Sequence, residues 1–328
     1  MIVVTGGAGF IGSAIVWRLN LLGQENIIIV DSLGTGEKWK NLVGLKYADV
    51  YNKKDFIQRV IEENVPFDID AIIHMGACSS TTEKDADYLL ENNYRYTTEL
   101  VKYCLPRKAR FIYASSAATY GDGSQGYNDN ENELQRLQPL NMYGYSKHMF
   151  DIWARRMKIL DKIAGMKFFN VYGPNEYHKA DMRSVIHKAY GQILETGKVK
   201  LFKSYHPNYK DGEQMRDFVY VKDVVDMTLF FLENRDKNGI YNIGSGKART
   251  WNDLIKAIFS ALKLEPQIEY IEMPEVLKNK YQYFTEANLG KVIKAGYTKP
   301  VTSLEDGVKD YVINYLRENK YLGSELAR

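Results

Sequence analysis

Short apolar runs rich in β-branched residues alternate, along the first half of the chain, with longer stretches of mixed polarity. The apolar runs have the length of strands and lie at residues 2–4, 27–30, 71–75, 110–115 and 166–171. The stretches between them have the length of helices and lie at residues 11–22, 55–63, 86–105 and 146–160. Strands without a polar face are typical of a parallel sheet covered by helices on both sides. The pattern therefore predicts an α/β fold with a doubly wound parallel sheet.

The pattern changes after Pro174. Longer polar loops there separate predicted helices at 183–195 and 251–262 from an extended run at 267–271. We predict two domains: a large one formed by residues 1–173 and about 217–246, and a smaller α/β substrate-binding one formed by residues 174–216 and about 247–328. The length of the polar loop at 122–141 is typical of a functional or mobile segment.

The composition excludes several classes of protein. The 328 residues are 45% hydrophobic and 26% charged, which excludes intrinsic disorder and fibrous repeats as the main state. The chain has 44 basic and 41 acidic side chains, and a net charge of +3 does not indicate nucleic acid as a partner. No run reaches the roughly 18 apolar residues of a membrane helix. The apolar start has no basic region before it, so we do not expect a signal peptide.

The two cysteines, Cys78 and Cys104, have no metal-ligand spacing, and we find no cluster of histidines, cysteines and carboxylates that suggests a metal. Few cysteines without a pairing pattern are typical of a reducing compartment. We therefore expect a cytoplasmic protein whose thiols are small, half-buried side chains. His74 lies inside an apolar strand, where we expect a hydrogen-bonded core residue.

The strongest motif is a glycine-rich turn, Thr-Gly-Gly-Ala-Gly-Phe-Ile-Gly at residues 5–12, which follows the first strand and opens the first helix. Gly6, Gly9 and Gly12 allow a tight turn and let a pyrophosphate approach backbone N–H groups at a helix N-terminus. Asp31 lies 19 residues after Gly12, at a strand end, where an acidic residue binds a ribose. No Gly-Lys-Ser/Thr follows, which excludes a Walker A loop. The motif predicts a Rossmann-type dinucleotide site.

A second motif pairs Tyr143 with Lys147 at a spacing that places both on one helix face. An ammonium beside a phenol lowers the phenol's pKa, which suits a tyrosine to proton transfer near neutral pH. Ser116 stands at the end of a predicted strand, and its hydroxyl is suited to hydrogen-bond the substrate oxygen that Tyr143 protonates or deprotonates. These three residues predict an acid–base site.

Together with Asn92, these motifs resemble the extended short-chain dehydrogenase/reductases, a family of nucleotide-sugar epimerases and dehydratases. The stretches 170–174 (Asn-Val-Tyr-Gly-Pro) and 216–223 (Arg-Asp-Phe-Val-Tyr-Val-Lys-Asp) extend the resemblance into the second half. Within the family, the chain is similar to the branch that epimerises ADP-heptose. This similarity is carried by Gly-Ala-Cys-Ser-Ser-Thr-Thr-Glu at 76–83, Asn-Met-Tyr-Gly-Tyr-Ser-Lys at 141–147, His-Lys at 178–179 and Lys-Tyr-Gln-Tyr-Phe-Thr at 280–285. The match runs from Met1 to about Tyr315.

The resemblance implies a role for each matching residue. Tyr143 would be one acid/base, held by Lys147, with Ser116 on the reacting oxygen, and Lys179 would be a second acid/base on the opposite face of the reacting carbon. The implied cofactor-binding residues are Gly6, Gly9, Phe10, Ile11, Gly12, Asp31, Ser32, Lys38, Lys53, Met75, Gly76, Ala77, Cys78, Ser79, Asn92, Tyr143, Lys147, Val171 and Lys179. The implied substrate-binding residues are Ser116, Asn170, Asp181, Lys188, Phe202, Lys203, Ser204, Arg216 and Tyr281.

The charged residues near the predicted ribose site indicate whether the cofactor has a 2′-phosphate. Asp31 alone favours NAD, because a carboxylate accepts a hydrogen bond from a free 2′-hydroxyl and repels a 2′-phosphate. Lys38 and Lys53, in the loops after the second and third strands, are placed to neutralise a 2′-phosphate. Members of the family retain lysines there and use NADP. We therefore favour NADP, and NAD stays open.

Two positions depart from the family pattern. Asn175 stands where the family often has an arginine, so one positive charge is missing. Lys188 stands where other members have a histidine, and His187 is its neighbour, so either could reach the substrate. Arg216 suits bidentate pyrophosphate recognition, although it could pair with Asp217 or Glu213 instead. Four aromatic residues are expected to pack in the core rather than stack on a cofactor: Phe168, Phe169, Tyr172 and Phe218.

The resemblance implies an isomerase that converts ADP-D-glycero-β-D-manno-heptose to the L-glycero epimer at C6″, for lipopolysaccharide core precursors. It also implies tightly bound NADP and a homo-oligomer, a pentamer in the family. C6″ has no neighbouring carbonyl and hence no acidic proton, so transient oxidation to a 6″-ketone is the accessible route.

Three other functions are compatible with a Rossmann-type dinucleotide site. A 4,6-dehydratase usually has an Asp-Glu pair after the active-site hydroxyl residue, where this chain has Ala117 and Ala118. A UDP-hexose 4-epimerase would share the core but would not explain Lys179 or the stretch at 76–83. A non-catalytic Rossmann dinucleotide sensor would have no need of Ser116, Tyr143 and Lys147 together.

Overall fold

The computed structural model describes residues 1–278 and 281–326. Its centre is a seven-stranded sheet in which every neighbouring pair is parallel, in the order β10-β6-β5-β4-β1-β2-β3. The strands are β1 (Ile2–Thr5), β2 (Ile27–Asp31), β3 (Asp49–Asn52), β4 (Ala71–His74), β5 (Arg110–Ser116), β6 (Ala164–Phe168) and β10 (Gly239–Ile243). The predicted doubly wound parallel sheet is confirmed.

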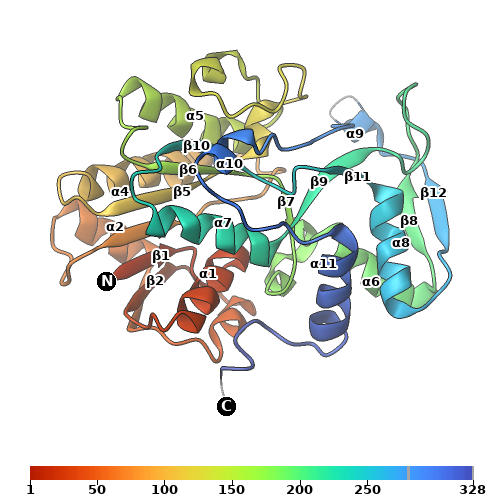
Figure 1. Cartoon of the computed structure of the whole chain (residues 1–328), viewed down its shortest axis with the longest axis horizontal. Coiled ribbons are helices and arrows are strands. Elements are labelled where there is room, and N and C mark those ends of the chain that lie inside the picture. Colours follow the sequence, from red (N-terminus) through yellow and green to blue (C-terminus); the bar gives the residue numbers. More distant parts are fainter. Residues whose placement is uncertain (279–280, 327–328) are drawn as a thin grey trace.

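Helices cover both faces of this sheet (Figure 1). Val3 and Val4 are fully buried, and they belong to two different core clusters because successive strand residues point to opposite faces. The cluster of Val4 includes α1 (Phe10–Leu21) and α7 (Val221–Glu233), and the cluster of Val3 includes α2 (Lys53–Ile61), α4 (Tyr96–Cys104) and α5 (Met142–Arg156). A short α3 (Ala86–Leu89) precedes α4.

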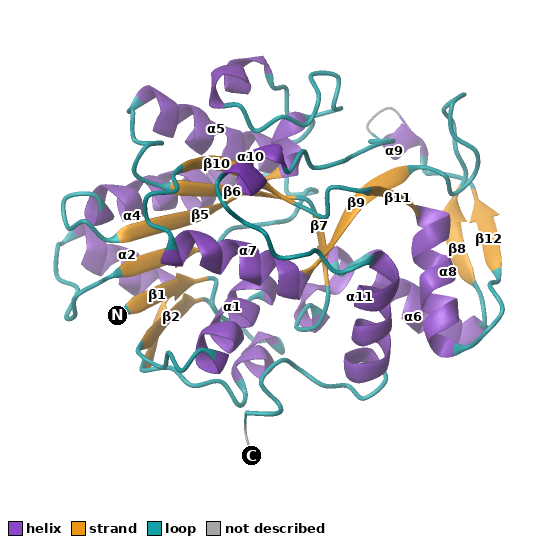
Figure 2. Ribbon diagram, viewed as in Figure 1, coloured by secondary structure: helices purple, strands orange, loops and turns teal. Residues whose placement is uncertain are grey.

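The second half of the chain adds two small sheets beside the large one (Figure 2). One has the order β11-β9-β7, with β7 (Asn170–Tyr172), β9 (Met215–Tyr220) and β11 (Ala248–Thr250). The other pairs β12 (Ile268–Ile271) with β8 (Val199–Phe202). The helices here are α6 (Val185–Thr196), α8 (Trp251–Leu262), α9 (Glu275–Lys278), α10 (Gly290–Lys294) and α11 (Leu304–Asp310). Because β10 returns to the large sheet, the chain crosses between the two parts more than once; the domain boundaries stay a prediction.

Several elements differ from the sequence prediction. The run predicted as one strand at 166–171 divides into β6 and β7, which belong to different sheets. Helix α5 begins at Met142 instead of residue 146, because the Asn141 side chain caps it by accepting from the Gly144 N–H at 2.8 Å. Strand β3 was missed because it is a polar edge strand without a buried residue. Lys280, which opens the motif at 280–285, lies outside the described residues. Among the described residues, no helix is long and apolar enough to span a membrane.

Candidate functional site

A cavity of about 800 Å³ opens at the carboxyl ends of β1, β4 and β5. This is where open parallel sheets bind their ligands. Every residue predicted to bind the cofactor lines it, and so do the predicted catalytic residues. Of the residues predicted to bind substrate, Ser116 and Asn170 line the cavity. The cavity therefore brings the dinucleotide motif and the acid–base motif into one site.

The glycine turn has the geometry of a phosphate cradle. Gly6 has a φ of +65°, and a Cβ there would lie 2.7 Å from the backbone N of Gly76. A Cβ on Gly12 would lie 2.0 Å from the carbonyl oxygen of Gly6. Gly9 caps α1 without any side chain, so the helix N-terminus faces the cavity through backbone groups. The residues present fit a dinucleotide pyrophosphate.

Asp31 lies in the cavity wall at the carboxyl end of β2. Its Oδ2 accepts from the N–H of Ala8 at 3.0 Å, and its Oδ1 accepts from Lys38 Nζ at 2.9 Å. Lys53 Nζ donates to Asn92 Oδ1 at 2.6 Å, and burial lowers the pKa of this lysine. Two ammonium groups and one carboxylate therefore surround this end of the cavity, where the charge balance is positive.

A π-helical turn, Leu90–Arg95, supplies Asn92 to the cavity. Such turns recur at functional sites. The next side chain, Asn93, holds the loop after β4: it accepts from the Cys78 N–H at 2.8 Å and donates to the Cys78 carbonyl at 3.0 Å. It also donates to Ser146 Oγ on α5 at 3.0 Å. The loop carrying the stretch at 76–83 is thereby tied to the helix of Tyr143.

The first turns of α5 place Tyr143 and Lys147 in the cavity wall. Burial raises the pKa of Tyr143, and a hydrogen bond with Ser116 partly offsets this. Lys147 Nζ donates to the Ala114 carbonyl at 2.7 Å, and burial lowers the pKa of Lys147 to about 8. The prediction that the pKa of Tyr143 is lowered is wrong. Its pKa is raised, because burial of the phenol outweighs the hydrogen bond with Ser116.

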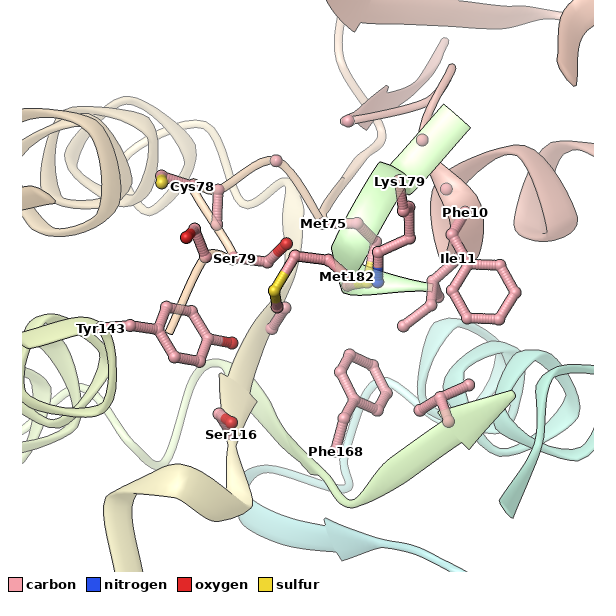
Figure 3. A pocket seen from close by; sticks show the side chains of 18 of the residues that line it. Phe10, Ile11, Met75, Cys78, Ser79, Ser116, Tyr143, Phe168, Lys179 and Met182 are labelled. Carbon is pink, nitrogen blue, oxygen red and sulfur yellow. The ribbon is translucent and has the colours of Figure 1, made fainter. Parts of the chain in front are cut away.

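Lys179 lies on the other side of the cavity, on the 3-10 segment Tyr177–Met182. Its Nζ is 5.3 Å from the centre of the Phe10 ring. Burial lowers the pKa of Lys179, and the nearby Glu176 carboxylate opposes that shift. Figure 3 shows Tyr143 with Ser116 on one side and Lys179 on the other, separated by Met182. Two groups able to transfer protons thus face one cavity from different directions.

Seven residues predicted to bind substrate are not part of the cavity wall: Asp181, Lys188, Phe202, Lys203, Ser204, Arg216 and Tyr281. Asp181 and Lys188 are exposed, and His187 packs edge-on against Tyr177 at 5.5 Å. Neither His187 nor Lys188 lines the cavity, so the choice between them stays open.

Arg216 belongs to an aromatic cluster beside the cavity. Its guanidinium carbon lies 5.3 Å from the Tyr281 ring centre and 5.7 Å from that of Trp251, whose Nε1 donates to the Tyr281 hydroxyl at 2.9 Å. Trp251 also lines the cavity. The carboxylate of Asp217 accepts instead from backbone N–H groups of Ser245, Gly246 and Ala287. Arg216 therefore lies against aromatic rings and donates to the Met215 carbonyl at 2.8 Å, and it pairs with neither of the alternative partners, Asp217 and Glu213.

The structure adds cavity residues that the sequence did not indicate. They include Tyr88, His178, Met182, Trp251 and Leu254. These residues reach the cavity through the fold. His178 belongs to the His-Lys motif at 178–179, but the motif did not indicate that its side chain lines the cavity. The four aromatic residues expected in the core are all buried, and they also line the cavity. His74 is confirmed as a core residue, bonded to Thr5 and Thr97. The described residues contain no group of metal-ligating side chains.

The NAD dependent epimerase/dehydratase family matches residues 2–244, most of the chain. The chain belongs to this family. Its curated relatives include the ADP-L-glycero-D-manno-heptose-6-epimerase of Nitratidesulfovibrio vulgaris, 59% identical over 96% of this chain and 98% of that protein. The protein of the same name from Fusobacterium nucleatum is 53% identical, over 98% of this chain and 100% of that one. These relatives place the chain in the ADP-heptose 6-epimerase branch of the family.

Solved structures of this family have the same fold. The Helicobacter pylori ADP-L-glycero-D-manno-heptose-6-epimerase superposes with a TM-score of 0.80, at 30% identity and over 95% of each chain. The UDP-glucose 4-epimerase of Thermotoga maritima superposes with a TM-score of 0.77, at 26% identity, over 97% of this chain and 99% of that one. The fold alone therefore does not distinguish between epimerases of different sugars.

Proposed function

We propose that the protein interconverts the two C6″ epimers of ADP-glycero-β-D-manno-heptose by transient oxidation to a 6″-ketone. The observation that carries the proposal is the placement of Tyr143 and Lys179 on different sides of one cavity that also contains a dinucleotide cradle. The printed names of relatives more than half identical to this chain support the choice of sugar.

The chemistry follows from the carbon that reacts. C6″ has no neighbouring carbonyl, so removal of its hydrogen as a proton is too costly. A bound nicotinamide dinucleotide supplies reversible acceptance of that hydrogen as hydride. Tyr143, hydrogen-bonded by Ser116, exchanges the hydroxyl proton on one side. When the ketone presents its other face, Lys179 exchanges the proton on the opposite side.

Lys147 has a separate task in this proposal. Its ammonium is buried beside the Ala114 carbonyl, on the same helix face as Tyr143 and one turn further along. From there it is placed to bind a ribose hydroxyl of the dinucleotide and to orient Tyr143. Asn92, from the π-helical turn, and Val171, on the edge strand β7 of the adjacent small sheet, complete the proposed cofactor wall.

The proposed cofactor is NADP, with NAD as the alternative. Lys38 neutralises Asp31, so the carboxylate no longer repels a 2′-phosphate at full strength. Lys53 adds a second positive charge at the same end of the cavity. Ammonium groups form strong charge-assisted hydrogen bonds to phosphate. This local charge supports NADP, whereas the family description mentions NAD.

The substrate nucleotide is proposed to bind beside the cavity, at the cluster of Arg216, Tyr281 and Trp251. A guanidinium held by two rings presents its remaining N–H groups to a pyrophosphate without a competing carboxylate partner. Phe202 ends β8 near this region, and Lys203 and Ser204 follow the strand. Asn170, Asp181 and Lys188 are kept as proposed sugar contacts.

We also propose a cellular location, an oligomeric state and a biosynthetic role for the enzyme. A cytoplasmic enzyme fits the two free cysteines. A homo-oligomer and a role in lipopolysaccharide core precursor synthesis follow from the resemblance to the family. No nucleic acid or membrane partner is proposed.

The test is to release the dinucleotide from purified protein, identify it by mass spectrometry, and then assay the protein with ADP-heptose, UDP-glucose and UDP-galactose. We expect NADP and turnover of ADP-heptose alone. Turnover of the UDP-hexoses with no turnover of ADP-heptose would instead establish a 4-epimerase, the activity named for the similar Thermotoga maritima structure.

A further inference from the structure

Asn175 has an unusual position for a side chain outside the cavity wall. It has a left-handed backbone with a φ of +75°, and it is fully buried. Asparagine tolerates this conformation better than most residues. Its Nδ2 donates to Ser13 Oγ on α1 at 2.9 Å, and its Oδ1 accepts from the Leu322 N–H at 2.9 Å. One amide therefore joins the first helix to the C-terminal tail (residues 320–326).

A second buried amide joins the same backbone to the glycine turn. Asn41 Nδ2 donates to the carbonyl of Ala8 at 2.9 Å and to that of Asn175 at 3.0 Å. The same nitrogen lies 3.1 Å from His178 Nδ1. Ala8 lies within the turn, and His178 precedes Lys179 in the chain. The segment 175–182, which we call the Lys179 loop, is thus attached to the glycine turn by the side chain of Asn41, which belongs to neither.

The C-terminal tail covers the Lys179 loop. Tyr177 donates to the Lys320 carbonyl at 2.9 Å, and its ring centre lies 4.8 Å from that of Tyr321. Leu322 is fully buried. Trp17 on α1 donates to Glu325 at 2.6 Å. The tail therefore contacts both the Lys179 loop and α1, and Asn175 and Leu322 are buried where the three segments meet.

We infer that Asn175 is a positioning residue, which holds the Lys179 loop against α1 and the C-terminal tail and so sets the place of Lys179 opposite Tyr143. The inference rests on the acid/base role proposed above for Lys179. Asn175 lies four residues before Lys179, whose N–H donates to the Glu176 carbonyl at 3.0 Å, so a shift at Asn175 passes along a short segment. An arginine here would have to bury its charge in the left-handed conformation with no carboxylate among Asn175's hydrogen-bond partners.

The test uses Asn175→Gly, because glycine accepts the left-handed backbone and removes both side-chain hydrogen bonds. Lys108→Gly is the matched control, since Lys108 is exposed, has a φ of +57° and precedes the amino end of β5, whereas the cavity lies at the carboxyl ends of the strands. The assay is a single-turnover reduction of the bound dinucleotide by each purified epimer. Lys179→Met is measured in parallel to identify which epimer depends on Lys179.

Asn175→Gly is expected to slow the oxidation of the Lys179-dependent epimer by roughly tenfold or more, since a misplaced reacting group costs rate steeply. The other epimer should react within about twofold of the wild-type rate. Lys108→Gly should change neither rate. Equal slowing of both epimers would show a general structural role and overturn the inference.

Amide hydrogen exchange separates this inference from the proposed function. In Asn175→Gly, amides of residues 176–184 and 320–326 should exchange faster, while those of β1 and β4 stay as in the wild type. If Lys179→Met reacts normally with both epimers, the acid/base role of Lys179 fails. The exchange result then decides alone whether Asn175 anchors the loop, and unchanged exchange there would refute it.

Discussion

Lys38 Nζ lies 2.9 Å from Asp31 Oδ1 at the carboxyl end of β2, so the acidic residue of the dinucleotide site is already paired. Each partner lines the cavity. Removal of the lysine would leave the carboxylate free to accept from a 2′-hydroxyl and to repel a 2′-phosphate. We therefore expect the preference between NAD and NADP to depend on this pair together with Lys53.

The double variant Lys38→Gln/Lys53→Gln should lose affinity for NADP by a factor of about a hundred or more and keep its affinity for NAD. Each charge-assisted contact to phosphate contributes roughly 1.5–3 kcal/mol, and only NADP has the 2′-phosphate. Isothermal titration with both dinucleotides measures the two affinities. Lys54→Gln, at an exposed neighbouring position, is the control. Equal weakening of both cofactors would show that the two lysines do not bind the phosphate.

Gly12→Ala should abolish retention of the dinucleotide, because its Cβ would lie 2.0 Å from the Gly6 carbonyl oxygen and would displace the turn. Gly191→Ala is the matched change, since a Cβ at this helical glycine has no atom within 4 Å. That control should be stabilised by roughly 0.5–1 kcal/mol, as Ala is a better helix former than Gly. Mass spectrometry of released dinucleotide and thermal unfolding measure both effects. Normal retention in Gly12→Ala would mean that the turn does not bind pyrophosphate.

Much of the cofactor half of the site could be predicted from the sequence, because its residues lie in continuous motifs. Gly6 needs a left-handed backbone, and a Cβ on Gly9 or Gly12 would lie only 3.0 or 2.0 Å from the Gly6 carbonyl oxygen, so the spacing of the three glycines carries the geometry. Asp31 and Lys38 follow one strand, and the parallel order of the sheet brings strand ends together. For these residues, their order along the chain and the parallel sheet are sufficient to predict that they lie together.

The rest depended on contacts between distant segments. Arg216 and Tyr281 are 65 residues apart, and no pattern indicates that they meet over Trp251 beside the cavity. The pKa of Tyr143 was predicted in the wrong direction, because the sequence shows that Lys147 is near but not how deeply the phenol is buried. The tail contact at Asn175 likewise joins positions 147 residues apart. Burial and long-range packing are properties of the whole fold.

The pH dependence of activity should contain an alkaline limb from Lys147. Burial lowers the pKa of this lysine to about 8, so it loses its proton and its ability to hold the ribose as the pH rises through that value. We expect kcat/KM to fall above about pH 8. Lys147→Arg stays protonated and should lack this limb, even if its rate is lower at all pH values. An identical limb in both proteins would assign the ionisation to another group.

Arg216→Ala should raise the KM for ADP-heptose more than it lowers kcat, because pyrophosphate contacts persist from the bound substrate to the transition state. Steady-state kinetics with ADP-heptose measure both constants. Lys247→Ala, which removes an exposed cation from a neighbouring loop, should leave both unchanged. A collapse of kcat at constant KM would assign Arg216 to the chemical step instead.

The central claim is that the hydrogen on C6″ moves as hydride and returns to the same carbon, while Tyr143 and Lys179 exchange only the hydroxyl proton. The most direct measurement is turnover of ADP-heptose by the wild-type protein in heavy water, followed by mass spectrometry and proton NMR of both epimers at equilibrium. The account predicts full epimerisation with no deuterium at C6″. Deuterium at C6″ would contradict it, because that hydrogen would then have left as a proton.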